Sequence, residues 1–119
     1  MKIHRGEIVL VDFPFSNRLE RKIRPALVVQ SDEWNQKLDD TILALITSSH
    51  RRRVGAATQF FVDISTVEGK QTGLRRDSVI QCENLITYEQ NLILRALGRL
   101  PFSALQQVNH CLKAALGVS

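Results

Sequence analysis

The chain has 119 residues, of which 44% are hydrophobic, and it carries a formal net charge of +4. This length and composition exclude an intrinsically disordered chain and predict a single domain, residues 1–119, that is stable without disulfide bonds or metal ions. Because no apolar run is long enough to cross a bilayer and the first residues lack the apolar core of a signal peptide, we expect a cytoplasmic protein without membrane association.

Short β-branched runs between polar segments predict a β-sheet in the first part of the chain. Residues 7–13 are expected to form one strand, and the polar residues 16–23 are expected to form a loop. A second strand is expected over 25–30, since a strand tolerates proline at its first position, here Pro25. Its nearly continuous apolar run is typical of a strand that is buried on both faces.

The middle of the chain predicts further strands separated by turns. A short helical turn is expected near residues 32–35. Strands are expected over 41–47, 58–64 and 78–85, with one more short strand between 92 and 99. Turns are expected throughout 65–77, which contains two glycines, and a polar segment follows at 87–91.

The end of the chain has the pattern of an amphipathic helix over residues 102–116. Pro101 precedes this segment and Gly117 is a natural C-terminal cap. Apolar residues recur at three- and four-residue spacing and form one stripe: Leu105, Val108, Leu112 and Leu116. The predicted fold class is therefore mainly β with one C-terminal α-helix, which covers a small, strongly bent antiparallel sheet or open barrel.

The basic residues are clustered, and the isoelectric point near 9.5 favours an anionic partner. They fall into three predicted loop segments: Arg18, Arg21, Lys22 and Arg24; Arg51, Arg52 and Arg53; Lys70, Arg75 and Arg76. If the three segments converge on one face, they form a phosphate-binding surface. The alternative is that each is a solvated loop that keeps the protein soluble.

The cysteines and histidines do not predict a metal site. Cys82 and Cys111 lack C-x-x-C spacing and are expected to be buried free thiols. The three histidines share no metal-type spacing with each other or with the cysteines. We therefore expect neither a metal nor another cofactor.

Two polar clusters stand at predicted strand ends. Arg24 precedes the second strand, and Pro25 restricts its backbone to an extended conformation. Thr47 and Ser48 end the third strand. If these strands are antiparallel neighbours, the start of one lies beside the end of the other, so that a guanidinium and two hydroxyls surround one small volume.

An RNA strand bound in that volume would supply its own nucleophile, the 2′-hydroxyl. Its cleavage needs a base, donors to the phosphate and an acid, but neither a metal nor a protein nucleophile. Arg24 suits charge stabilisation, and Thr47 and Ser48 can donate to the phosphate oxygens. Glu83 is the proposed base if burial raises its pKa, and His50 is the alternative base because of its intrinsic pKa.

Four segments, in the same order and at similar distances, resemble the MazF/PemK family of toxin endoribonucleases. They are Arg5-Gly6-Glu7-Ile8, Arg24-Pro25-Ala26-Leu27-Val28-Val29, Ile46-Thr47-Ser48 and Gly73-Leu74-Arg75-Arg76-Asp77-Ser78-Val79-Ile80. The resemblance implies an SH3-like barrel of the CcdB/PemK type that acts as a homodimer. It implies metal-independent cleavage of single-stranded RNA such as mRNA at short sequences, leaving a 2′,3′-cyclic phosphate and a 5′-hydroxyl. It also implies a cognate antitoxin that holds the toxin inactive.

The resemblance places the catalytic residues of the family on Arg24, Thr47, the following Ser48 and the acidic Glu83. The expected RNA-binding residues are Arg18, Arg21, Lys22, Arg51, Arg52, Arg53 and Gln81. The chain departs from the family pattern in the loop before Arg24, which lacks glycine, and at Asn84, where the family favours glutamine.

Two other functions are compatible with parts of the sequence. The first is a CcdB-like toxin that binds DNA gyrase without catalysis, although that branch lacks the Arg24-Pro25 and Thr47-Ser48 pairs. The second is a module that binds RNA without cutting it, which the basic segments alone would support equally well.

Overall fold

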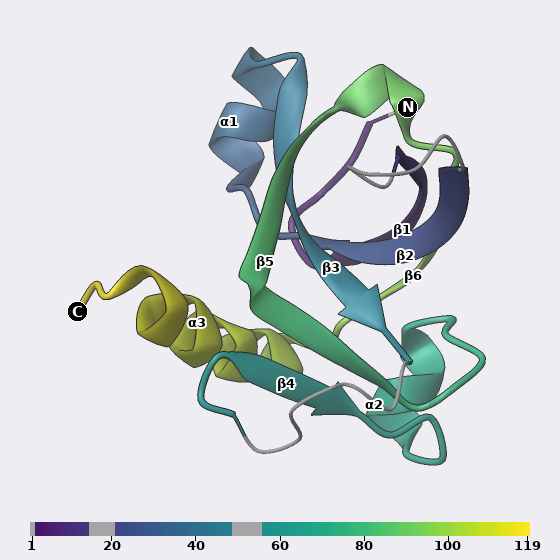
Figure 1. Cartoon of the computed structure of the whole chain (residues 1–119), viewed down its shortest axis with the longest axis vertical. Helices are drawn as coiled ribbons and strands as arrows, with labels where there is room; N and C mark the ends of the chain where they lie inside the picture. The colour runs from purple at the N-terminus through teal and green to yellow at the C-terminus, as the bar shows by residue number, and fades with distance from the viewer. Residues whose placement is uncertain (1, 15–20, 49–55) are drawn as a thin grey trace.

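The computed structural model describes residues 2–14, 21–48 and 56–119, which form a curled antiparallel sheet with a helix packed against it (Figure 1). The six strands are β1 (Glu7–Pro14), β2 (Arg21–Val28), β3 (Asp40–Thr47), β4 (Gln59–Val62), β5 (Ser78–Glu89) and β6 (Arg95–Arg99). Their order in the sheet is β4-β5-β3-β2-β1-β6. The helices within these ranges are α1 (Asp32–Lys37), α2 (Val67–Gln71), α3 (Phe102–Leu116) and the short 3₁₀-helix η1 (Gln90–Leu92). The predicted fold class is confirmed.

Both faces of the central strands are buried, as the apolar run of the second strand predicted. Alternate side chains of a strand point to opposite faces, so Leu27 of β2 joins one apolar cluster, whereas Ala26 and Val28 join another. On β3, Ala44 and Ile46 belong to the first cluster. The strands that carry the predicted site are therefore anchored on both sides.

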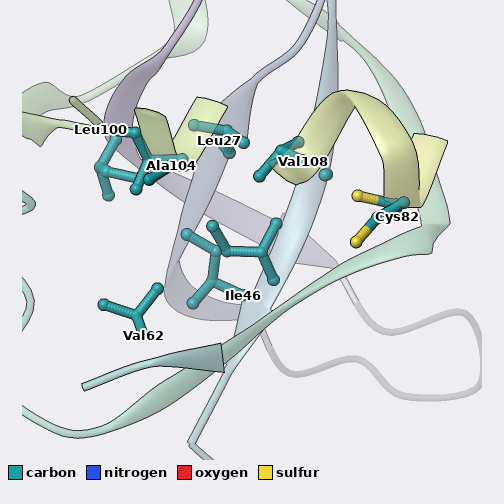
Figure 2. Packing of buried hydrophobic residues seen from close by; sticks show 11 residues of the cluster. Leu27, Ile46, Val62, Cys82, Leu100, Ala104 and Val108 are labelled. Carbon is teal, nitrogen blue, oxygen red and sulfur yellow. The ribbon is translucent and has the colours of Figure 1, made fainter. Parts of the chain in front are cut away.

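Helix α3 covers the first cluster and has the predicted bounds. Gly117 ends it in the left-handed conformation, with φ of 68°. Val108 and Ala104 face Leu27 and Ile46 across the core (Figure 2). The buried stripe differs from the predicted one, since Leu116 is 60% exposed while the shorter Ala104 and Cys111 are buried. Small side chains lie at the contact because the helix packs close to β4 and β5.

Two strands are longer than predicted because neighbouring strands extend them. Strand β2 begins at Arg21, inside the predicted loop, where its residues pair with the end of β1. Strand β5 runs to Glu89 through the predicted polar segment, because Thr41 and Asp40 of β3 pair with Tyr88 and Glu89. The turn segment 65–77 contains the short helix α2, which the sequence analysis did not predict.

A bulge bends β5 in its middle, as the kink in Figure 1 shows. Leu85 pairs with Ala44, but the next pair along β3 joins Leu45 to Gln81. Residues 82–84 therefore have no partner in the β3 ladder.

Both cysteines are buried free thiols, as expected. Within the described ranges, no helix combines the length and hydropathy needed to span a membrane.

Candidate nucleic-acid interface

Pro25 lies inside β2, where the strand loses contact with β3. It pairs with Leu10 of β1, so it does not begin the strand as predicted. The ladder to β3 starts only at the next residue, with Ala26 opposite Leu45. Proline has no N–H to donate to a ladder, and the two strands are not paired beyond it. Extending the same register places Arg24 opposite Thr47 at this opening.

One hollow of about 470 Å³ lies at the opening, and we call it the cationic hollow. Residues of β2, the end of β3 and the segment before β5 line it. Its basic lining residues are Lys22, Arg24, Arg75 and Arg76, and its hydroxyl-bearing residues are Thr47, Ser48 and Ser78. Among the described residues, no carboxylate lines it. The first and third basic segments of the sequence therefore converge here, and the hollow suits an anion.

A second hollow of about 230 Å³ shares Arg24, Ile46 and Thr47 with the first. We call it the amide hollow, because Gln81 and Asn84 line it, together with the ring of Phe13. The Asn84 side-chain amide donates a hydrogen bond of 3.5 Å to the Gln81 amide oxygen. Its lining combines an aromatic residue with two amide side chains and suits a flat group that can form hydrogen bonds.

Arg24 and Thr47 form the boundary between the two hollows. Both side chains are half-buried, while Ser48 is exposed. Rigid strands hold them: Arg24 pairs with Val11 of β1, and Thr47 pairs with Val79 of β5. A guanidinium and a hydroxyl from neighbouring strands thus face both hollows, as the antiparallel arrangement predicted.

Glu83 does not line either hollow. It lies in the bulge of β5, is exposed, and accepts a hydrogen bond of 2.6 Å from the Gln59 side-chain amide. The burial that its role as a base required is absent. No histidine or carboxylate among the described residues lines either hollow, so these linings do not identify a base.

The other predicted RNA-binding residues are placed only in part. Lys22 lines the cationic hollow and Gln81 lines the amide hollow. Arg18, His50, Arg51, Arg52 and Arg53 lie outside the described residues, as does the side chain of Arg21.

Sequence reasoning missed Phe13, Asn84, Arg75 and Arg76 as residues that line these hollows. The sequence pattern predicts Phe13 only as the last residue of a strand, and Asn84 lies at the bulge, which the sequence does not reveal. Arg75 and Arg76 had been identified as part of a basic segment, which was the available signal. Within 2–14, 21–48 and 56–119, no group of three or more His, Cys, Asp or Glu side chains is placed to hold a metal ion.

Comparison of the sequence with known proteins identifies similar toxins. A sequence model of the PemK-like, MazF-like toxins of type II toxin–antitoxin systems matches residues 4–116. Endoribonuclease MazF6 of Mycobacterium tuberculosis strain H37Rv is 30% identical over 117 residues, which are 98% of each chain. Endoribonuclease MazF of Staphylococcus saprophyticus is 28% identical and aligns over 98% of this chain and 92% of its own.

Solved structures have the same fold. A mycobacterial endoribonuclease in complex with its cognate antitoxin superposes with a TM-score of 0.76 at 20% identity, covering 98% of this chain and 97% of the other. The MazE–MazF complex (Form-III) from Deinococcus radiodurans gives a TM-score of 0.76 at 19% identity, with both chains fully covered. At these identities the structural likeness shows the fold alone.

Proposed function

Because this chain belongs to the family of PemK-like, MazF-like toxins of type II toxin–antitoxin systems, we propose that it is a toxin that cleaves single-stranded RNA, such as mRNA. The observation that carries this proposal is the position of Arg24 and Thr47 on neighbouring antiparallel strands, where both line the same two hollows. A charge-stabilising guanidinium and a hydroxyl donor at one point supply the hydrogen-bond donors that phosphodiester cleavage needs at the phosphate.

In the proposed reaction, the 2′-hydroxyl of the RNA attacks the adjacent phosphorus. A P–O bond forms to the 2′-oxygen while the bond to the 5′-oxygen of the next nucleotide breaks. The products are a 2′,3′-cyclic phosphate and a 5′-hydroxyl. A base removes the 2′-hydroxyl proton, and an acid supplies a proton to the leaving oxygen. Negative charge builds up on the non-bridging oxygens, where Arg24, Thr47 and Ser48 would donate hydrogen bonds.

The two hollows suit the two parts of a nucleotide strand. The cationic hollow would hold the phosphates, because its basic lining carries no opposing carboxylate among the described residues. The amide hollow would hold the nucleobase of a nucleotide next to the cleaved bond. Phe13 supplies a face on which a base can stack, and Gln81 and Asn84 can hydrogen-bond its edge. The rate of cleavage would therefore depend on which nucleobase occupies this position of the RNA.

We propose Glu83 as the general base, although it is exposed and lines neither hollow in the absence of RNA. It lies between Gln81 and Asn84, which both line the amide hollow. Since its carboxylate accepts a hydrogen bond from Gln59, it would reach the 2′-hydroxyl only after exchanging that bond for one to the RNA. A Glu83→Gln variant should lower kcat by about 10²-fold or more. A loss smaller than tenfold would assign the proton transfer to another group.

The proposed partners follow from the family and from the charge of the site. We infer a cognate antitoxin that covers the cationic hollow with an acidic segment, which would compete with RNA for the same cations. We also infer a homodimer that acts in the cytoplasm, where its RNA substrate is found. Large apolar side chains such as Phe102, Val67 and Phe61 are exposed in the isolated chain and could be covered in such an assembly.

The experiment that tests the proposal is digestion of a long RNA by the purified protein in excess EDTA. We expect discrete fragments whose 5′ ends are hydroxyls and accept phosphate from polynucleotide kinase without prior phosphatase treatment. Sequencing of these ends would give the cleavage site. Intact RNA, or fragments that form only when a divalent metal is added, would refute the proposed mechanism.

A further inference from the structure

We propose that Arg75 and Arg76 form a phosphate clamp, which holds the RNA strand beside the bond that is cut. This inference rests on the proposed function and adds a substrate-positioning role for two residues of the segment between α2 and β5. The clamp would bind a phosphodiester group next to the reacting one, so that it affects substrate binding more than the chemical step.

The position of the two arginines relative to β3 is the first observation. Strand β3 lies between β2 and β5 in the sheet. Lys22 and Arg24 reach the cationic hollow from the β2 side, and Arg75 and Arg76 reach it from the segment that leads into β5. Cations therefore flank the Thr47 end of β3 on both sides. Neighbouring strands are ~4.8 Å apart, so the backbones of β2 and β5, which lie on either side of β3, are about 10 Å apart. A single phosphodiester strand can pass between the two cationic groups at this spacing.

The second observation is that, among the described residues, no acidic side chain forms an ion pair with either arginine. In the described part of the chain, the ion pairs join His4 to Asp32 and Lys37 to Glu33. Both arginines are exposed. Arg76 also borders a hollow that contains Asp63 and Asp77. Those carboxylates accept hydrogen bonds from backbone N–H groups, Asp77 from Ile64 and Asp63 from Ser65.

The third observation is that the segment carrying the arginines is fixed at both ends. Before them, Gly73 has φ of 75°, and a Cβ atom there would lie 2.2 Å from the Leu97 carbonyl oxygen. The buried Thr72 hydroxyl accepts from the Leu74 N–H at 3.2 Å and donates to the Gly69 carbonyl at 2.5 Å. After them, the Ser78 hydroxyl donates to the Arg76 carbonyl at 2.8 Å.

A rigid backbone lowers the entropy lost when the arginines bind a phosphate. A merely solvated basic loop would not need this support. The flanking position distinguishes Arg75 and Arg76 from Arg95 and Arg99 of β6, which are the other exposed arginines among the described residues and line neither the cationic nor the amide hollow.

The test compares two double variants of the full chain with the same loss of charge. In R75Q/R76Q we expect KM for a single-site RNA oligonucleotide to rise at least tenfold, with kcat within about threefold of wild type. The slope of log(kcat/KM) against log[salt] should become shallower by about 1.4, because each lost contact to a single strand contributes about 0.7. The matched control R95Q/R99Q should keep the wild-type KM and slope.

Two further substrates locate the clamp along the RNA. One oligonucleotide is shortened on the 5′ side of the cleaved bond and the other on the 3′ side. The oligonucleotide that lacks the clamped phosphate should have the same kcat/KM with wild type and with R75Q/R76Q, whereas the other should still be cut less efficiently by the variant. An unchanged KM and salt slope, a loss confined to kcat, or an equal effect of both shortened substrates would overturn the clamp. If wild type cuts no RNA at all, the proposed function fails instead.

Discussion

Replacing Arg24 by alanine tests the proposed catalytic centre most directly. The side chain is half-buried at the boundary of the two hollows, while its backbone remains paired with Val11. Since the ladder does not depend on the guanidinium, we expect the variant to lose about 1 kcal/mol of unfolding free energy or less. Its fold and assembly should be unchanged.

The expected loss of activity follows from the position of the guanidinium. It would donate to oxygens that gain negative charge in the transition state, in a partly enclosed site. Losing one such donor in comparable sites raises the barrier by ~3–4 kcal/mol, which corresponds to ~10²–10³ in rate. Arg24→Lys keeps the positive charge but loses the planar pair of donors, so we expect an intermediate loss of about tenfold.

The assay is single-turnover cleavage of an RNA that contains the mapped site, with the thermal midpoint Tm of each variant measured in parallel. Arg99→Ala is the matched control, because it removes the same charge from a hollow lined by Glu7 and Asp32 instead. If Arg24→Ala keeps more than about a tenth of the wild-type rate, or if Arg99→Ala loses as much, the assignment of Arg24 is wrong.

Four further predictions concern chemistry and stability. Thr47→Val should slow cleavage by about tenfold or more at unchanged Tm, since it removes a proposed donor to the phosphate. Excess EDTA should leave the wild-type cleavage rate unchanged, because the proposed reaction uses the 2′-hydroxyl of the RNA and protein side chains. Gly73→Ala should lower the unfolding free energy by about 2–4 kcal/mol, because φ is 75° and the new Cβ would lie 2.2 Å from the Leu97 carbonyl oxygen. The control is Gly117→Ala, at φ of 68° with open space around it, which should lower the unfolding free energy by only about 1–2 kcal/mol. Burial raises the pKa of Cys82 from the ordinary thiol value of 9.0 to about 12. Its contribution to stability is therefore complete below the ordinary value and is lost as pH rises toward the folded value. In urea unfolding, the stability difference between wild type and Cys82→Ala should shrink by roughly 1 kcal/mol from pH 8 to pH 10.

Local patterns in the sequence were sufficient wherever a segment's own residues decide its conformation. The C-terminal helix has the predicted bounds, because Pro101 precedes its first residue and Gly117 ends it in the left-handed conformation. The strands over 7–13 and 41–47 differ from β1 and β3 by one residue at an end. The positions of Arg24 and Thr47 at facing strand segments also followed from the sequence, since antiparallel pairing of adjacent strands is the simplest arrangement.

Other features depend on contacts between segments that are distant in the chain. Residues 21–23 belong to the mostly polar segment that predicts a loop, but pairing with the end of β1 makes them a strand. The bulge at 82–84 bends β5, brings Asn84 to the amide hollow and leaves Glu83 outside both hollows. A period-two pattern cannot reveal an insertion in a ladder, because register is a property of two strands.

The sequence by itself therefore determined the β-rich fold class, the terminal helix and the residue types that handle a phosphate, because these depend on local conformation and intrinsic chemistry. Only the tertiary structure decided that Arg75 and Arg76 line the hollow of Arg24 and Thr47, whereas Glu83 does not. The physical reason is that side chains from separate segments meet only after strand order and register are set, and those depend on long-range pairing.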